Sequence, residues 1–135
     1  MCRYGLGLEF PIRRVGGGRM KTVFKTLPRK FEDCGATIND FGKLCLRANE
    51  MVSIAAKSGK KYDITAKEWG FYLAPSLNSR MRREGFKVAL VLNNENKLFV
   101  NAVDKDKVAD FKKYLKSGNN GSIICWLDEL SIKKG

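Results

Sequence analysis

The sequence contains no histidine. Histidine is the commonest general base in enzymes and the usual partner of a nucleophilic serine or cysteine, so its absence excludes Ser-His and Cys-His dyads. It also excludes zinc sites that combine cysteine with histidine. The cysteines never stand in C-x-x-C spacing, and this predicts free thiols in a reducing compartment; they are Cys2, Cys34, Cys45 and Cys125. We therefore expect no catalytic residue, no metal and no cofactor.

A long apolar run is also missing. The longest are short segments such as "VALVL" (88–92) and "IICWL" (123–127), whereas a membrane helix needs about 20 apolar residues. The N-terminal "YGLGLEFPI" is interrupted by Glu9 and Pro11, which is not typical of a secretory signal. These observations predict a soluble, intracellular, cytoplasmic protein with no membrane partner.

Acidic residues are scarce relative to basic ones. The chain has 26 Lys and Arg against 14 Asp and Glu, which gives a formal net charge of +12 and a pI near 9.7. Such a charge attracts polyanions, nucleic acid first and an anionic membrane surface second. The alternative is a solvated lysine-rich surface that binds neither.

The first 19 residues lack the periodicity of the rest. They are rich in glycine and end in "GGGR", directly before Met20. We hypothesise that translation naturally begins at Met20 and that residues 1–19 are a flexible or non-native extension; the alternative is a basic arm that contacts phosphates. Residues 20–135 keep 22 basic and 13 acidic residues, a net charge of +9. We predict that they form a single α+β domain.

Residues 40–56 carry two competing patterns. Their apolar residues fall at the i, i+3, i+4, i+7 spacing of one helix face, with Asp40 or Asn39 as cap and Gly59 as terminator, and this favours a helix. Leu44, Leu46 and Ala48 also alternate, so a pair of strands, "KLCLRA" and "MVSIAA", remains open. Upstream, strands are predicted at about 21–27 and 34–38.

Residues 65–85 predict two helices separated by a proline. After a short strand at 61–65, Thr65 and Glu68 have the spacing of a capping box, and Trp69, Tyr72 and Leu73 would form the buried side of the first helix. Pro75 ends that helix, Ser76 caps a second over 76–84, and Gly85 closes it.

The C-terminal part predicts a hairpin of strands at 86–93 and 97–103, an amphipathic helix at 105–117 capped by Asp104, and a last strand in "SIICWL". Trp69 and Trp126 each lie in an apolar pattern and are predicted to be core residues rather than stacking platforms. The hairpin residues Leu90 and Val100 also predict a sheet whose apolar face is covered.

The order helix, short strand, helix, turn, basic helix and hairpin resembles the winged helix-turn-helix superfamily of DNA-binding domains. The residues that carry the resemblance are "DITAKEWGFYLAPSLNSRMRREGF" and "KVALVLNNENKLFV", within about 40–103. The resemblance implies a non-enzymatic, DNA-binding and possibly regulatory protein, with double-stranded DNA favoured over RNA and a winged-helix-like centre beside a small antiparallel sheet.

The second helix has two sides. Leu77 and Met81 point one way, and the opposite side offers the groups that suit a DNA groove: Asn78, Ser79, Arg82 and Arg83. Phosphate contacts are predicted for flanking cations: Arg80, Lys87, Lys60 and Lys61. Two further hypotheses remain. One is a protein–protein assembly module, which includes a homodimer, that uses the hairpin and the last strand; the other is a small-ligand binder or enzyme that uses Glu50, Asp63 or Glu68.

Overall fold

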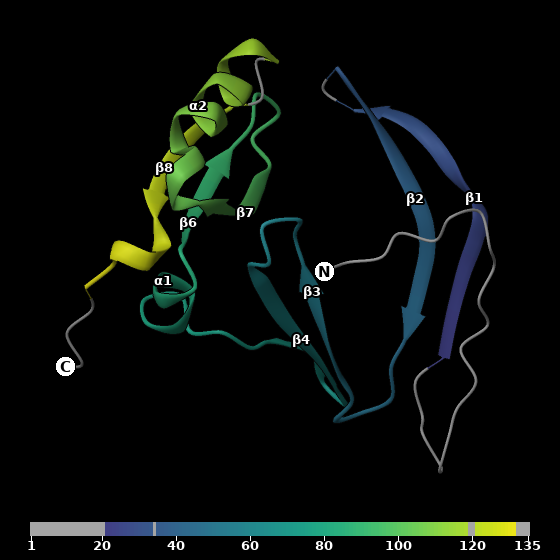
Figure 1. Ribbon diagram of the computed structural model, residues 1–135. Coiled ribbons are helices and arrows are strands. Elements are labelled where there is room, and N and C mark those ends of the chain that lie inside the picture. The colour runs from purple at the N-terminus through teal and green to yellow at the C-terminus, as the bar shows by residue number, and fades with distance from the viewer. Residues whose placement is uncertain (1–20, 34, 119–120, 132–135) are drawn as a thin grey trace. The chain divides into compact units, whose positions relative to one another are not determined.

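The structure, a computed structural model, describes residues 21–33, 35–118 and 121–131 (Figure 1). The hypothesis about residues 1–19 and Met20 lies outside these residues. The chain divides into two compact units, Met1–Ala74 and Pro75–Gly135. Antiparallel strands with a C-terminal helix and strand confirm the predicted α+β class.

The first unit begins with a long two-stranded ribbon. Strand β1 (Lys21–Asp33) pairs antiparallel with β2 (Ala36–Cys45), and Gly35, at φ 79°, lies in the turn between them. The strands predicted at 21–27 and 34–38 are thus confirmed in type and are longer than expected. The register shifts between Phe24 and Arg29, where four residues of β1 face a single residue of β2.

A three-stranded antiparallel sheet completes the described part of this unit. Its order is β3 (Met51–Ala55), β4 (Lys61–Lys67) and β5 (Gly70–Leu73), joined by a turn that contains Gly59 and by the two-residue turn at Glu68 and Trp69. The strand predicted at 61–65 is therefore confirmed and continues for two further residues.

The predicted helix over 40–56 is wrong, and the alternative pair of strands is closer to the structure. Asp40 does not cap a helix; its carboxylate accepts the N–H of Gly42 within β2, at 3.0 Å. Asn49 adopts φ 69° in the loop before β3, and Gly59, at φ 90°, turns the chain into β4. Pairing with other strands determines the secondary structure of this region, because the hydrogen bonds of a strand are made with residues outside its own segment.

The predicted helix over 65–73 is also wrong, so no pair of helices forms around Pro75. Thr65 lies inside β4 opposite Tyr72, and the proposed capping box with Glu68 is absent. Gly70, at φ 140°, begins β5 directly after the turn. Trp69 at the turn is 72% exposed, which contradicts its assignment to the core, and Tyr72 and Leu73 are exposed as well.

The second unit is a three-stranded antiparallel sheet with one long helix. Strands β6 (Phe86–Leu92), β7 (Leu98–Asp104) and β8 (Ser122–Trp126) lie in the order β7-β6-β8. After η1 (Lys105–Lys107), helix α2 (Val108–Ser117) packs along the sheet (Figure 1), and η2 (Leu127–Glu129) follows β8. The predicted hairpin, helix and last strand are confirmed, as is the Asp104 cap, which accepts the N–H of Asp106 at 2.9 Å.

The core of this unit lies between α2 and one face of the sheet. Ala89 and Val91 of β6 and Leu115 of α2 are buried together, with Phe111, Ile123 and Trp126 packed around them. Trp126 is therefore part of the core, as predicted. The opposite face carries Leu98 and Val100, which pair with Leu92 and Leu90, and both are more than half exposed. The helix thus covers one face of the sheet only, and the prediction that the face of Leu90 and Val100 is covered is wrong for Val100.

Candidate nucleic-acid interface

The segment between Pro75 and β6 forms a tight basic turn of helix. Helix α1 (Arg80–Arg83) is only four residues long, so the predicted helix over 76–84 is shortened to a single turn preceded by a hydrogen-bonded turn. The hydroxyl of Ser76 accepts the N–H of Arg80 at 2.9 Å, and its carbonyl accepts that of Met81. Gly85, at φ 88°, ends the segment in the left-handed conformation, as predicted.

The two sides of this segment are as the sequence predicts. Met81 is fully buried, and α1 lies against β6. Arg82 and Arg83 are exposed with Asn78 and Ser79, and together these four make the polar surface of the turn. We call them the Asn78–Arg83 surface. Arg80 is only half exposed and has interactions of its own.

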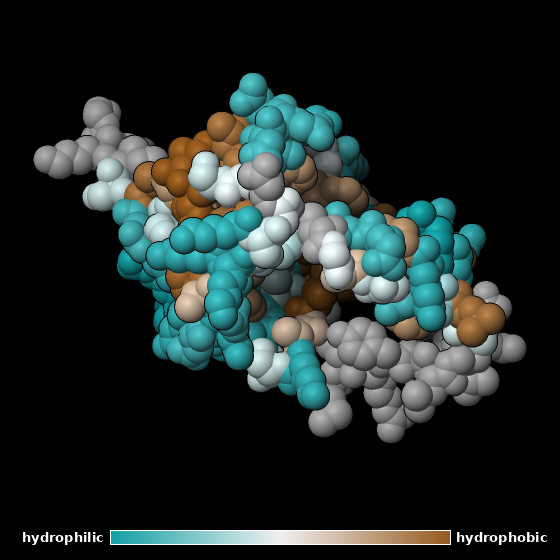
Figure 2. Space-filling model, turned by 90° about the horizontal axis from the view of Figure 1, so that it is seen from above, coloured by the Kyte–Doolittle hydropathy of each residue, from teal (hydrophilic) through white to brown (hydrophobic). Residues whose placement is uncertain are grey.

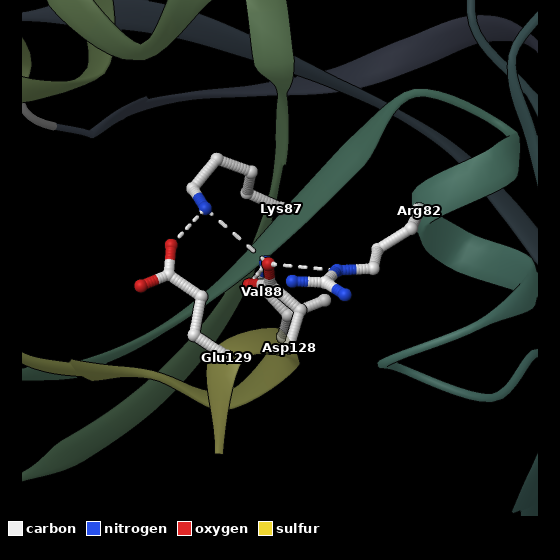
Figure 3. Close-up of polar contacts among 5 residues, drawn as sticks. All are labelled: Arg82, Lys87, Val88, Asp128 and Glu129. Atoms are coloured by element: carbon white, nitrogen blue, oxygen red, sulfur yellow. Dashed lines mark hydrogen bonds and ion pairs between the residues drawn. The ribbon is translucent and has the colours of Figure 1, made fainter. Parts of the chain in front are cut away.

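Lys87 is not part of that exposed surface, because its ammonium group is held by the C-terminal residues (Figure 3). Its Nζ lies 3.3 Å from Oδ2 of Asp128 and also bonds to the carboxylate of Glu129. The same Nζ is 4.8 Å from the centre of the Trp126 ring. A phosphate group that bound Lys87, as the sequence predicts, would therefore have to compete with three side chains of the same unit.

Asp128 is the residue that sequence reasoning missed. Its side chain is 1% exposed, yet each of its oxygens has a partner: Oδ1 accepts the N–H of Val88 at 2.8 Å, and Oδ2 pairs with Lys87 (Figure 3). Nε of Arg82 is 3.9 Å from Oδ2, a longer contact, and the Arg82 side chain stays 54% exposed. Asp128 thus ties η2 to β6 and leaves Arg82 able to contact a ligand.

The neighbouring carboxylates raise the pKa of Lys87. The hydrogen bond that Lys87 donates to Glu129 is the largest cause that raises its pKa above the usual value of 10.5, the bond that it donates to Asp128 acts in the same direction, and partial burial opposes both. Because the pKa is raised on folding, the ion pair contributes stability below pH 10.5 and loses that contribution as the pH rises through the folded value. Lys87 is therefore fully charged at neutral pH.

Lys60 and Lys61 lie in the first unit, at the turn that leads into β4. Lys61 is exposed, while Lys60 is partly buried and has interactions of its own. The structure thus groups the predicted residues of the 76–87 region within one unit and places this pair of lysines in the other.

Two of the three carboxylates considered for an enzyme accept local hydrogen bonds. Asp63 is buried on β4 and accepts the hydroxyl of Ser53 at 2.6 Å. Glu50 accepts the N–H of Arg47 at 2.6 Å, and Glu68 is exposed at the turn after β4. Within residues 21–33, 35–118 and 121–131, no group of three or more Cys, Asp or Glu side chains is arranged to hold a metal ion.

Further exposed cations lie on α2. Lys112, Lys113 and Lys116 are exposed along its outer side, away from Phe111 and Leu115. In Figure 2 most of the visible surface is hydrophilic, and hydrophobic side chains reach it in separate patches. The basic character predicted from composition is therefore spread over both units.

The chain matches no known family model, no curated protein and no solved structure. Of the helices in the described part of the chain, none is both long and apolar enough to cross a membrane.

Proposed function

We propose that the protein binds nucleic acid, with double-stranded DNA favoured over RNA, and that it does so without catalysis. The observation that carries the proposal is the division of the 76–85 segment: Met81 is fully buried, whereas Asn78, Ser79, Arg82 and Arg83 are exposed together. A net charge of +9 over residues 20–135 supports attraction to a polyanion.

The short helix indicates how such binding would work. A recognition helix reads bases by lying in the major groove, and a single turn offers little length for this. Guanidinium groups bind phosphate well in a bidentate manner, and Asn and Ser side chains also donate to phosphate oxygens. The Asn78–Arg83 surface is therefore proposed to contact chiefly the phosphate backbone, with weak or no sequence preference.

The arginine pair provides the direct test. Replacing Arg82 and Arg83 together by alanine is expected to weaken binding to duplex DNA and to reduce the slope of log K against log salt by up to about two units. The measurement is fluorescence anisotropy with a labelled duplex at several salt concentrations.

The matched control removes the same charge elsewhere in the same unit. The pair Lys112→Ala and Lys113→Ala lies on the outer side of α2, where both lysines are exposed. We expect a smaller change in affinity and slope for this variant. Equal effects of the two pairs would mean that overall charge, and not the Asn78–Arg83 surface, governs binding.

A second function is favoured by the uncovered face of the β7-β6-β8 sheet. Val100 is 64% exposed, and Leu98 and Ile124 are also more than half exposed. Because β7 is an edge strand, its backbone can pair with another strand as well. We propose, as the alternative, a protein–protein assembly module that forms a homodimer through this hairpin.

The oligomeric state tests the alternative. Sedimentation equilibrium is expected to show a dimer that Val100→Glu converts to a monomer, because a charge on the exposed face or edge opposes apolar contact. Asn94→Glu, in the turn between β6 and β7, is the matched control and should leave the dimer intact. A wild-type protein that stays monomeric at high concentration would contradict the homodimer.

A further inference from the structure

The irregular stretch of β1 presents an apolar side chain to solvent. Four residues, 25–28, stand opposite Phe41 alone, because the pairing passes directly from Phe24 with Gly42 to Arg29 with Asp40. Leu27 within this bulge is 80% exposed, a larger fraction than any other large apolar residue of the described chain. This leucine stands in the unpaired bulge of a strand that is paired on both sides of it.

The bulge is fixed on both sides. On one side Gly42 lies so close to β1 that a Cβ atom there would be 1.9 Å from the carbonyl oxygen of Val23. On the other, Asp40 accepts the N–H of Gly42 and pairs with Arg29, whose Nη2 is 3.2 Å from Oδ2. The Gly42 bond first and the Arg29 bond second lower the pKa of Asp40, so its carboxylate is charged throughout the neutral range.

Pro28 limits the conformation of Leu27 itself. A residue that precedes proline is held in extended geometry, and proline has no N–H for a partner strand. Pro28 therefore restrains the backbone of Leu27, whose side chain is largely exposed, and little backbone entropy is lost if the leucine is inserted into a partner.

Cations surround this leucine. Lys25 and Arg29 are two residues away on either side, and because strand side chains alternate they lie on the same face as Leu27, each about 7 Å along the strand. Lys30 follows, also exposed. The Arg29 guanidinium lies 4.9 Å from the centre of the Phe31 ring, which restricts its position further. An apolar tip between two cations is complementary to the stacked bases and flanking phosphates of a duplex.

We infer that Leu27 is a wedge that inserts between base pairs of duplex DNA, with Lys25 on an adjacent phosphate, while Arg29 stays paired with Asp40 and holds the bulge in place. Proteins that bend DNA insert leucine, proline or other apolar side chains at a base step, and the unstacking is compensated by the wider contact that the bend permits. This inference rests on the proposed function, and it adds that the protein kinks the DNA that it binds.

The test uses the full chain and a duplex that carries 2-aminopurine together with a donor and acceptor dye at its ends. Wild-type protein is expected to raise 2-aminopurine fluorescence and to increase energy transfer. Leu27→Ala should return both signals to those of the free duplex while it leaves the salt slope unchanged, and Leu27→Met should restore them. Leu130→Ala, which removes an exposed apolar side chain in the other unit, should behave as wild type.

The outcomes separate the inference from the function on which it rests. Salt-dependent binding without any rise in 2-aminopurine fluorescence, or with a rise that Leu27→Ala preserves, overturns the wedge and leaves DNA binding intact. An absence of salt-dependent binding to the duplex overturns the proposed function. Vesicles that contain phosphatidylserine form a further arm: binding to them that Leu27→Ala abolishes, with duplex signals unchanged, would assign Leu27 to a lipid surface and overturn the wedge.

Discussion

Replacing Asp128 with alanine is expected to lower the free energy of unfolding of the second unit by about 3 kcal/mol. The variant leaves the buried N–H of Val88 without its acceptor and removes the buried one of the two negative charges that pair with the half-buried Lys87. Because Lys87 and Arg82 reach solvent, the decrease in the free energy of unfolding should lie at the lower end of the range expected when a fully buried ion pair is broken. Urea unfolding followed by Trp126 fluorescence, in a Trp69→Phe background, measures it.

Two further variants separate the contributions. Asp128→Asn keeps an oxygen for Val88 and loses only the charge, so it should cost less than alanine. Glu129→Ala removes an acid that is 51% exposed and should cost less than about 1 kcal/mol. If Asp128→Ala were no more harmful than Glu129→Ala, the attachment of η2 to β6 through Asp128 would be wrong.

The second large effect is expected at Gly42 in the ribbon. An alanine Cβ would stand 1.9 Å from the Val23 oxygen at φ 124°, so β1 and β2 must separate or shift their register. Overpacking and backbone strain together predict a loss of more than about 3 kcal/mol for Gly42→Ala. The bulge that carries Leu27 would be disturbed with it.

Hydrogen exchange at the amides of β1 measures the change. Gly42→Ala should sharply increase the exchange of Val23 and Phe24, which flank the close approach. Gly59→Ala is the matched control, since it also has a positive φ but meets no atom within 4 Å, and a cost of about 1 kcal/mol is expected. Equal protection of β1 in both variants would contradict the tight contact at Gly42.

The C-terminal elements could be predicted from the sequence because their signals are local. The hairpin has two apolar runs separated by "NEN", and α2 has a single helical stripe that ends beside Gly118. The exposed and buried sides of the 76–84 segment followed from the four-residue spacing of Leu77 and Met81. What could not be predicted was that only one turn of helix forms there.

Apart from the strand at 61–65, residues 40–73 could not be predicted because their patterns fit two structures. The apolar residues around Leu44 and Ala48 fit both the helical period and the alternation of a strand. Thr65 and Glu68 have the spacing of a capping box, although Thr65 lies in β4 and Glu68 in the turn that follows it. The deciding interactions are hydrogen bonds to β1 and between β3, β4 and β5, which join segments distant in the sequence. Gly70, at the start of β5, was the available sign of a tight turn.

The residues around the candidate site were missed for a similar reason. Asp128 looks like an ordinary acid after a strand, and only the fold brings it to Val88 and Lys87. The bulge of β1 depends on a register shift that no local pattern shows, although Pro28 indicates an irregularity in the strand.

The most direct test of nucleic-acid binding is a salt-dependent titration of the wild-type protein against duplex DNA, single-stranded DNA and RNA. Duplex DNA is expected to bind most tightly, and log K is expected to fall linearly as log salt rises. A binding curve for the duplex that does not change with salt, or no duplex binding even at low salt, would contradict it.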